Sequence, residues 1–579
     1  MNHDAIDAGA KAIVEVPVPA EWADAETESL FVEAKGDNKP LVDYINNVQN
    51  YVNGQEGNAL KVSDLVPYVD GHMPLGASAF EKRGVAVDVP SWNPDNCIQC
   101  NFCAYVCPHA TIRPVAMTEE EAKAAPAATK TADMTGMPGY KFAMTVTVLD
   151  CLGCGSCVNI CPGKKGEKAL TMQGLDSQRD QQEVYDYGQK LPAKEEVLAK
   201  FKADSVKGSQ FRQPMLEFSG ACAGCGETPY AKLITQLFGE RMYIANATGC
   251  SSIWGGSAPA TPYTTNAKGQ GPAWANSLFE DNAEFGLGMF TGQNTLREQT
   301  KEKVVALAES TDNADVKAAA AEYLDTYADG SKNGAATDKL VAALEACGCD
   351  AAKEILAKKE FLSKKSQWIF GGDGWAYDIG FGGVDHVLAS GEDVNVFVFD
   401  TEVYSNTGGQ ASKSTNLGAI AQFQAAGKGT KKKDLAAIAM SYGYVYVAQI
   451  AMGADYNQTV KAIAEAEAYP GPSLVIGYAP CINHGIKGGM KIAQTEEKKA
   501  VTSGYWNLFR FNPALAAEGK NPFHLDSKAP TTEYEDFIMG EVRYNALSRQ
   551  NPERAKELFA EAKANAEAKY NRLKEMSDK

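Results

Sequence analysis

The sequence lacks any long apolar run, and this lack excludes a membrane-spanning helix. No stretch approaches the roughly 20 consecutive apolar residues that such a helix needs. The first residues, MNHDAIDAGAKAIVEVPVPAEW, contain neither the basic segment nor the apolar segment of a signal peptide. We therefore expect a protein that stays in the cytoplasm and has no membrane partner.

The sequence also lacks an excess of positive charge. It has 56 basic and 73 acidic residues, a formal net charge of −17, and no basic cluster. Nucleic acid is therefore excluded as an expected partner. Hydrophobic residues make up 44% and charged residues 22% of the 579 residues, which is typical of a globular chain with roughly three or four domains of about 150 residues each.

Cysteine, in contrast, is abundant. The chain has 14 cysteines, which in a large cytoplasmic protein favour metal binding or catalysis over disulfides. Two runs share the spacing C-x2-C-x2-C-x3-C-P, which is typical of bacterial ferredoxins with two clusters. In that arrangement the fourth cysteine of each run binds the cluster of the other run. We expect one [4Fe–4S] cluster on Cys97, Cys100, Cys103 and Cys161, and a second on Cys151, Cys154, Cys157 and Cys107.

Zinc is the main alternative for these two runs, since C-x2-C pairs also build structural zinc sites. A pair of zinc sites requires only paired C-x2-C motifs. It does not require three equally spaced cysteines followed by Cys-Pro, twice in one chain. The pattern therefore favours iron–sulfur clusters, which carry single electrons.

After the cysteine runs, the sequence alternates short apolar segments with helix-forming segments. RMYIANATG, SQWIFGGDGW, EDVNVFVFDTE, YVYVAQIAM and PSLVIGYAP are nearly continuous apolar runs, as expected for strands of a parallel sheet covered on both faces. We predict an α/β fold with an open, mostly parallel sheet, preceded by a ferredoxin-like α+β domain.

The predicted domains follow from these changes in composition. They are the tail of a preceding α/β domain (1–90), a ferredoxin-like domain (91–172), a linker (173–215), an α/β domain (216–530) with a helical insert (about 294–365), and a C-terminal helical segment (531–579).

Two glycine-rich turns follow apolar runs in the α/β domain. IFGGDGWAYDIG contains Asp373, and 28 residues later VNVFVFDTEVYSNTGGQ contains Thr401. Ligands of open parallel sheets bind where strands end and helices begin, and a carboxylate and a hydroxyl are suitable oxygen ligands for Mg²⁺. The first turn is not G-x-G-x-x-G, which disfavours a nicotinamide cofactor. A GDG motif followed by an Asn-containing turn resembles the signature of thiamine diphosphate sites; the alternative is a pair of turns without a ligand.

The stretch SGACAGCGETPY contains a third C-x2-C pair, Cys222 and Cys225. Alone, this pair is half of a zinc site or a redox-active disulfide. Cys250 in ATGCSS and Cys481 in APCINHG lie in turns that follow apolar runs, so both are candidates for the two further ligands of a four-cysteine site. Cys347 and Cys349 in EACGCD have no such partners, and we interpret them as incidental thiols.

These motifs, together with NATGCSSIWGG and APCINHGI, resemble the C-terminal half of the pyruvate:ferredoxin (flavodoxin) oxidoreductases over essentially the whole chain. The resemblance implies oxidative decarboxylation of pyruvate on thiamine diphosphate and formation of acetyl coenzyme A. It also implies transfer of single electrons through three [4Fe–4S] clusters to ferredoxin or flavodoxin. Thiamine diphosphate supplies the decarboxylation chemistry, and a neighbouring cluster accepts electrons one at a time, which hydride acceptors do not.

The resemblance also assigns roles to individual residues. It implies that Cys222, Cys225, Cys250 and Cys481 bind the cluster nearest the thiamine, and that Asp373, Thr401 and the Val403 carbonyl bind Mg²⁺. It further implies that Gly372, Gly374, Trp375 and the loop through Asn406 line the diphosphate, that Glu227 and Cys250 contact the cofactor, and that Asn406 lies near the substrate as a catalytic residue.

This chain departs from the family in its length, since the members of the family are about twice as long. The other half carries most of the pyruvate and coenzyme A sites, so we expect this chain alone to be inactive or nearly so. A complete enzyme is expected to be a homodimer. The alternatives are an oxidoreductase for another 2-oxoacid, a non-catalytic electron relay of the polyferredoxin type, and a structural metal domain. His109 and His484 are expected to pack near the sites rather than to bind metal.

Overall fold

The computed structural model describes residues 2–24, 33–256 and 259–579. The chain divides into two compact units, residues 1–73 and 74–579, which are considered separately below. Within the described part of the chain, no helix is both long enough and apolar enough to cross a bilayer.

The described residues of the first unit form helices. They are α1 (Asn2–Lys11), η1 (Ala20–Asp24), α2 (Lys39–Tyr44), η2 (Ile45–Gln49), α3 (Asn50–Asn53), η3 (Gly57–Ala59) and η4 (Val62–Tyr68). The Asn38 side chain caps α2 by accepting the Leu41 N–H, and Tyr44 and Ile45 are buried. The sequence predicted the tail of an α/β domain up to residue 90, but residues 2–24 and 33–87 contain no strand. The β-like run Ile13–Val18 instead has its Ile and Val side chains 70–81% exposed.

The second unit begins with a domain built around the two cysteine runs. Strand β1 (Asp88–Trp92) pairs antiparallel with β5 (Leu170–Gly174), so the domain is closed by its first and last strands. Between them lies an antiparallel sheet in the order β2 (Ile112–Met117), β4 (Lys141–Val146) and β3 (Ala132–Asp133). The short helices are η5 (Ala77–Phe80), η6 (Pro94–Asn96), α4 (Phe102–Tyr105), α5 (Glu119–Ala124) and α6 (Ser156–Ile160). Each of α4 and α6 holds the third cysteine of its run, and so fixes that cysteine against the domain core.

The segment predicted as a linker forms helices. They are η7 (Leu175–Gln178), α7 (Gln181–Lys190), α8 (Glu195–Lys200) and α9 (Val206–Ser209). Helix α7 lies close against the ferredoxin-like sheet: a Cβ atom on Gly188 would be 3.0 Å from the Val115 side chain. Val184 and Val197 are buried. The segment therefore covers the ferredoxin-like domain rather than spanning open solvent.

An eight-stranded sheet forms the larger domain, and its order is β15-β14-β12-β13-β9-β8-β6-β7. The six strands from β7 to β12 in this order are parallel, and β14 and β15 are antiparallel. Their bounds are β6 (Met242–Ala247), β7 (Ala273–Ser277), β8 (Ser366–Gly372), β9 (Asn395–Asp400), β12 (Tyr446–Ile450), β13 (Ser473–Tyr478), β14 (Phe509–Phe511) and β15 (Phe523–Leu525). The predicted α/β class is confirmed.

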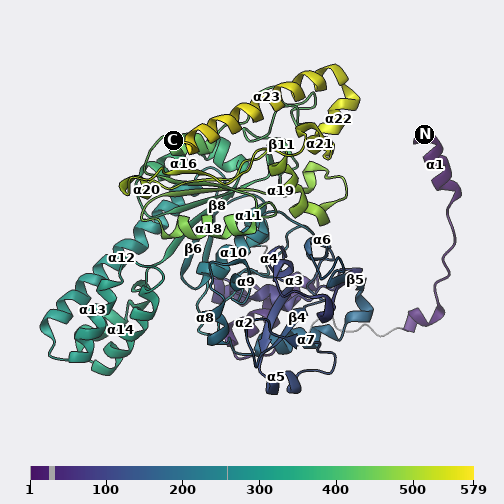
Figure 1. Ribbon diagram of the computed structural model, residues 1–579. Coiled ribbons are helices and arrows are strands. Elements are labelled where there is room, and N and C mark those ends of the chain that lie inside the picture. The colour runs from purple at the N-terminus through teal and green to yellow at the C-terminus, as the bar shows by residue number, and fades with distance from the viewer. Residues whose placement is uncertain (1, 25–32, 257–258) are drawn as a thin grey trace. The chain divides into compact units, whose positions relative to one another are not determined.

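Helices cover both faces of this sheet, and alternate residues of β9 face the two layers. Val396 and Val398 pack with α16 (Phe381–Ala389) and α17 (Leu435–Met440), whereas Phe397 and Phe399 pack with α10 (Thr228–Phe238) and α18 (Tyr456–Ala468). Figure 1 shows α10 and α18 between the sheet and the ferredoxin-like domain, and α16 on the opposite face. Continuous burial on both sides explains why the strands are apolar at every position.

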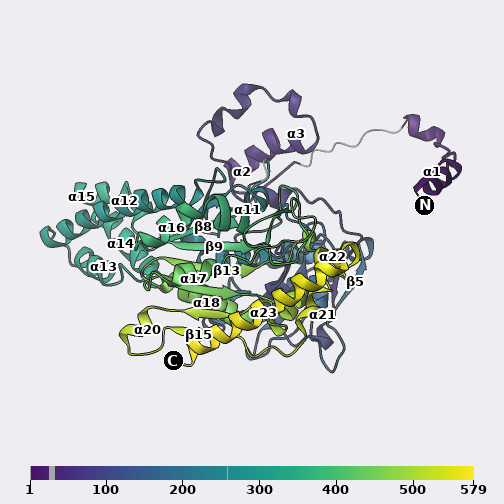
Figure 2. The ribbon, with the colours of Figure 1, turned by 90° about the horizontal axis from the view of Figure 1, so that it is seen from above.

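A helical insert separates β7 from β8. It comprises α12 (Asn282–Ser310), α13 (Ala314–Asp325), α14 (Asn333–Cys347), α15 (Asp350–Leu356) and η9 (Lys359–Phe361), and it has its own core. Both ribbon views show these helices projecting from one end of the sheet (Figures 1 and 2). The insert was predicted to begin near residue 294, but α12 begins at Asn282. Gly286, Gly288 and Gly292 lower the helix propensity of its first turns, and packing of Ala283 and Phe290 against the sheet outweighs that loss.

The chain ends in helices that pack on the antiparallel edge of the sheet. They are α19 (Ala493–Thr502), α20 (Ala514–Ala517), α21 (Tyr534–Ile538), α22 (Val542–Gln550) and α23 (Pro552–Ser577). Helix α23 buries Ala555, Leu558 and Phe559 and exposes a charged face, and it runs along the sheet in Figure 2. The remaining short elements are η8 (Gly239–Arg241), α11 (Cys250–Gly255), η10 (Gly374–Ile379), β10 (Val403–Tyr404), β11 (Gln410–Ala411), η11 (Ile482–His484) and η12 (Met490–Ile492).

Candidate functional site

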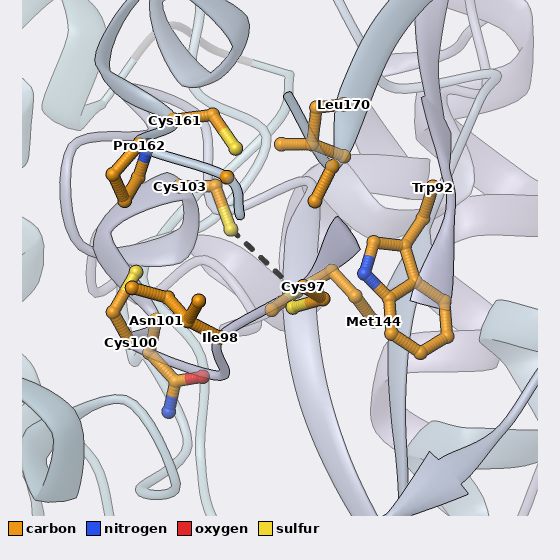
Figure 3. Close-up of a pocket in the computed structure, with 12 residues that line it drawn as sticks. Trp92, Cys97, Ile98, Cys100, Asn101, Cys103, Met144, Cys161, Pro162 and Leu170 are labelled. Atoms are coloured by element: carbon orange, nitrogen blue, oxygen red, sulfur yellow. Dashed lines mark hydrogen bonds between the residues drawn. The ribbon is translucent and has the colours of Figure 1, made fainter. Parts of the chain in front are cut away.

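The first cysteine set lines one cavity of the ferredoxin-like domain. Cys97, Cys100 and Cys103 come from the first run, and Cys161 comes from the second. Figure 3 shows the four side chains around a common space, with Trp92 and Met144 on its far side. Gln99 and Asn101 have φ angles of 57° and 63°, a left-handed conformation that allows the loop to wrap around the cavity.

The second set lines a separate cavity in the same way. Cys107 from the first run faces Cys151, Cys154 and Cys157 from the second. The two cavities thus each combine three cysteines of one run with the fourth cysteine of the other.

The three cysteine-containing loops share one backbone feature. In each loop, a backbone N–H donates to the sulfur of the cysteine two residues before it. Gln99 donates to Cys97 at 3.3 Å, Gly153 to Cys151 at 3.4 Å, and Glu227 to Cys225 at 3.4 Å. Such hydrogen bonds stabilise negative charge on sulfur and help to set cluster potentials.

Among the described residues, no group of three or more His, Cys, Asp or Glu side chains lies close enough to hold one metal ion. A tetrahedral zinc site would hold its sulfurs about 4 Å apart, since Zn–S bonds are about 2.3 Å long. In a cubane each cysteine binds a different iron, which suits a wider set.

Burial keeps the thiols of Cys103, Cys151 and Cys157 protonated until a metal binds. It raises the pKa of Cys151 to about 12, and it raises the pKa of Cys103 and Cys157 well above the ordinary range of a thiol. Metal binding must therefore release protons, so cluster assembly in these cavities favours higher pH.

The third set comes from three separate segments at the carboxyl edge of the large sheet. Cys222 and Cys225 precede α10, Cys250 begins α11 after β6, and Cys481 follows β13. The Cys225 loop lies directly on the Cys481 segment: the Gly226 N–H donates to the Pro480 carbonyl at 3.2 Å, and a Cβ atom on Gly226 would be 2.6 Å from the Pro480 nitrogen. Only glycine fits there.

Glu227 lies among these cysteines. It is buried and accepts a hydrogen bond of 2.7 Å from the Trp254 indole N–H. Burial raises the pKa of Glu227 to about 7. Burial raises the pKa of Cys225 and Cys250, and the negative charge of Glu227 raises both further. The Glu227 carboxyl is therefore close enough to act on both thiols electrostatically.

The oxygen atoms of Asp373, Thr401 and Val403 converge at the next two strand ends. The Thr401 hydroxyl lies 3.0 Å from Asp373 Oδ1 and 3.0 Å from the Val403 carbonyl oxygen. Mg²⁺ binds six oxygens at about 2.1 Å, which puts neighbouring ligands about 3.0 Å apart. The two distances from the Thr401 hydroxyl therefore match the spacing of neighbouring ligands in a magnesium octahedron, and the donor set fits the ion.

The charge environment of Asp373 also fits a cation. Its side chain is fully buried, and burial together with the nearby Asp400 raises its pKa well above the ordinary range. The Ser412 hydroxyl donates to Asp373 Oδ2 at 2.6 Å. Lys432 already pairs with Asp400 at 2.9 Å, and a cation at the Asp373 group would further offset the cost of two neighbouring buried carboxyls.

Glu402 lies between Thr401 and Val403 and stabilises the shape of the loop that follows β9. Its φ of 60° is left-handed, which is strained for a side chain of this size. Burial disfavours its charge, but Lys432 and Arg543 lower the pKa of Glu402 to about 2, and the Tyr505 hydroxyl donates to it at 2.5 Å. The buried ion pairs thus offset the strain.

The same loop reaches the third cysteine set. Ser405 Oγ donates to Cys250 Sγ at 3.1 Å, and Asn406 Oδ1 lies 4.0 Å from the same sulfur. The Asn483 side-chain amide donates to the Ser405 carbonyl at 3.3 Å and lies 3.6 Å from Cys481 Sγ. The structure therefore brings the predicted thiamine edge and the third cysteine set into contact.

The two histidines pack as structural groups beside these sites. His484 is buried with Nε2 2.7 Å from the Thr401 carbonyl, and His109 is buried with Nε2 2.9 Å from the Ala221 carbonyl. Burial lowers the pKa of His484 to about 3 and that of His109 to about 4, so both are neutral at ordinary pH.

Trp375 was expected to line the diphosphate site, but its side chain lies in the hydrophobic core. A Cβ atom on Gly371 or Gly380 would each be 2.3 Å from the Trp375 ring. Gly374 has a tight environment as well, since a Cβ atom there would be 2.6 Å from the Tyr404 ring, whereas Gly372 has more room. The glycines of this turn thus serve packing as well as any approach of a ligand.

Sequence reasoning missed four polar residues that hold these groups: Trp254, Ser405, Ser412 and Asn483. Trp254, Ser405 and Asn483 lie in the quoted motifs, so their positions beside candidate ligands were a usable signal. Ser412 lies outside these motifs, and its contact with Asp373 depends on how the chain returns after β11.

Comparison with protein-family models identifies three segments of the chain. A 4Fe-4S dicluster domain matches residues 96–165, and the C-terminal TPP-binding domain of thiamine pyrophosphate enzymes matches residues 342–476. A domain of unknown function (EKR) matches residues 33–86. The dicluster and thiamine-binding domains predicted from the sequence are confirmed.

The curated relatives include several pyruvate oxidoreductases. The chain is 52% identical to a pyruvate-flavodoxin oxidoreductase of Klebsiella pneumoniae and 52% identical to a pyruvate:ferredoxin oxidoreductase of Moorella thermoacetica, over 100% of this chain and 49% of each relative. It is 45% identical to a mitochondrial pyruvate dehydrogenase [NADP(+)] of Euglena gracilis, over 97% of this chain and 31% of that protein. The chain spans about half the length of the curated relatives it matches first.

A solved structure of a 2-oxoglutarate:ferredoxin oxidoreductase from Magnetococcus marinus, with 2-oxoglutarate, coenzyme A and succinyl-CoA bound, was also found. It covers 46% of this chain and 65% of its own, with 14% identity and a TM-score of 0.27, which is too low to support an argument.

Proposed function

We propose, from the premise that the strong homologues of this chain are pyruvate:ferredoxin and pyruvate:flavodoxin oxidoreductases, that it is the thiamine-binding and electron-transfer part of such an enzyme. The complete enzyme would decarboxylate pyruvate oxidatively, form acetyl coenzyme A and pass single electrons to ferredoxin or flavodoxin. The observation that supports this most directly is the contact between the Asp373–Thr401–Val403 oxygen group and the third cysteine set, through Ser405 and Cys250.

Each group of residues has a role in this proposal. Asp373, Thr401 and the Val403 carbonyl hold Mg²⁺, and the turn from Gly372 to Trp375 together with the loop through Asn406 receives the diphosphate. Glu227 contacts the cofactor, and Asn406 positions the substrate. When bound, thiamine diphosphate supplies the chemistry that removes carbon dioxide.

The three cysteine sets would each hold a [4Fe–4S] cluster, and such clusters would supply one-electron transfer away from the cofactor. The third set, Cys222, Cys225, Cys250 and Cys481, lies beside the cofactor edge. Its loop contacts the cavity of the second set, because His109, which lines that cavity, has its Nε2 2.9 Å from the Ala221 carbonyl. The exchange of Cys107 and Cys161 between the runs joins the second set to the first, whose cavity is bordered by the exposed Ile98.

The partners follow from the same proposal. Pyruvate and coenzyme A bind largely in the part of the relatives that this chain does not match, the complete enzyme is a homodimer, and it works in the cytoplasm. A polyferredoxin that only relays electrons would not need the Asp373–Thr401–Val403 group, so we favour the enzyme.

The experiment is an assay of the anaerobically purified chain, alone and together with a polypeptide that carries the other half of the relatives. We expect viologen dye reduction that depends on pyruvate and coenzyme A only with both parts. Parallel assays with 2-oxobutyrate and 2-oxoglutarate test the substrate. Reduction by the chain alone at ordinary rates would contradict the division of labour, and its absence with both parts would contradict the function.

A further inference from the structure

Two cysteines of the helical insert lie outside the three sets described above. Helix α14 ends at Cys347, Gly348 follows with a φ of 62°, and Cys349 precedes α15. The left-handed glycine turns the chain so that both side chains lie on the same side. Their sulfur atoms are 3.0 Å apart, about 1 Å more than a disulfide bond.

The surroundings of this pair suit reaction with small molecules. Both cysteines are partly exposed and pack at the edge of the insert's own core, far along the chain from the metal motifs. The two thiols have each other as neighbours and solvent on the outside.

We propose that Cys347 and Cys349 form a redox-active dithiol that exchanges with low-molecular-weight disulfides such as glutathione disulfide. Cys349 Sγ attacks one sulfur of the small disulfide, forms a mixed disulfide and releases one small thiol. Cys347 Sγ then attacks the Cys349 sulfur and releases the second thiol. The two protein thiols lose two electrons and two protons, and one small disulfide becomes two thiols.

Cys349 is the attacking group because its thiolate is stabilised. Cys347 donates a hydrogen bond to Cys349 Sγ, and this contact is the main cause that lowers the pKa of Cys349. The partly exposed sulfur of Cys347 is then placed to resolve the mixed disulfide.

Peptide mapping tests the proposal directly. Trypsin is expected to release residues 340–353, LVAALEACGCDAAK, which contains these two cysteines and no others. The full chain, purified anaerobically, is equilibrated in buffers of decreasing reduced-to-oxidised glutathione ratio, quenched with acid, alkylated with N-ethylmaleimide and analysed by mass spectrometry. We expect this peptide to change from a doubly alkylated form to an unalkylated form two mass units below the dithiol.

Serine variants separate the two roles. Cys347→Ser should trap glutathione on Cys349, since the resolving thiol is gone, and Cys349→Ser should accumulate little mixed disulfide. The double variant should keep the iron and sulfide content of the wild-type chain. A peptide that stays doubly alkylated at every glutathione ratio would overturn the proposal, and equal glutathione trapping in both single variants would overturn the assignment of Cys349 as the attacking thiol.

Discussion

Single polar contacts decide whether the Asp373 group can hold a cation. Asp373 is fully buried, and its second oxygen is fixed by Ser412, which sequence reasoning did not identify. Metal ligands depend on such supporting hydrogen bonds for their orientation.

Ser412→Ala should therefore weaken Mg²⁺-dependent binding of thiamine diphosphate by about 10- to 100-fold. The affinity is measured by calorimetric titration with and without Mg²⁺. Ser441→Ala is the control, because Ser441 is exposed and donates to the Ile438 carbonyl of its own helix. Unchanged affinity of Ser412→Ala for thiamine diphosphate would contradict the proposal that Asp373, held by Ser412, is a magnesium ligand.

Cys481 is the residue whose assignment relied most on resemblance, because it lies more than 200 residues from its partners. Cys481→Ser should lose one cluster and lower the iron content from about twelve to about eight atoms per chain. Cys347→Ser is the matched control and should keep all of them. Full iron content in Cys481→Ser would show that another residue is the fourth ligand.

Glu497 is a buried carboxyl that gives the fold a pH dependence. Its Oε2 accepts the Gly453 N–H at 2.8 Å and lies 3.2 Å from the Tyr230 hydroxyl, which itself lies 2.9 Å from the Tyr478 carbonyl. The Tyr230 hydroxyl has one proton for two acceptors, so a protonated Glu497 that donates to Tyr230 satisfies all three groups. Burial raises the pKa of Glu497 from 4.5 to about 8.

The raised pKa fixes the sign of the effect. Below about pH 4.5 the Glu497 carboxyl is neutral in both the folded and the unfolded chain. Between about pH 4.5 and 8 it is ionised in the unfolded chain but still neutral in the folded one. The free energy of unfolding therefore falls as pH rises through this range. Glu497→Gln should remove this fall and gain on the order of a few kcal/mol relative to the wild type at pH 8. Denaturant midpoints at pH 5 and pH 8 measure it, with the exposed Glu518→Gln as control. An equal pH dependence in wild type and Glu497→Gln would refute the neutral carboxyl.

At the scale of elements, helix α10 connects the two metal-binding parts of the second unit. Lys232 in this helix is buried and donates to the carbonyl oxygens of Ala104 and Tyr105, at the end of α4 between two cluster cysteines. Burial lowers the pKa of Lys232 to about 8. The lysine thus joins the thiamine-binding domain to the ferredoxin-like domain.

Lys232→Met should remove one hydrogen bond from each of the two carbonyl groups, of which Ala104 keeps the Cys107 N–H, and lower the free energy of unfolding by about 1–3 kcal/mol. Chemical denaturation followed by circular dichroism measures the change. Lys461→Met in α18 is the control, since Lys461 is exposed and makes only a surface ion pair. A loss no larger than that of the control would mean that the helix contact does not depend on this side chain.

The elements that sequence could predict are those with a strong local pattern. The apolar strands β6, β8, β9, β12 and β13 are confirmed, because burial on both faces leaves a continuous signal. The start of α12 was not predicted, because three glycines conceal a helix that tertiary packing stabilises. The position of the Trp375 ring was not predicted for a similar reason: a motif gives its place in the chain, but only the packing against Gly371 and Gly380 directs its ring into the core.

At the scale of the whole molecule, the cysteines also divide into those that a local sequence pattern predicts and those that it does not. The spacing of the two ferredoxin runs carries enough information to predict the exchange of Cys107 and Cys161, which is what the two cavities contain. The third set is assembled from three segments, so no local spacing predicts it. It exists only where β6 and β13 end at the same edge of the sheet as the Cys222–Cys225 loop, and it therefore depends on the folded thiamine-binding domain.

The central claim is that one chain holds three [4Fe–4S] clusters and one thiamine diphosphate. Anaerobic purification followed by iron, sulfide, zinc and thiamine analysis tests this most directly. The account predicts about twelve irons and about twelve sulfides, four of each from every cluster, and about one thiamine diphosphate per chain. Stoichiometric zinc without iron and sulfide would contradict it.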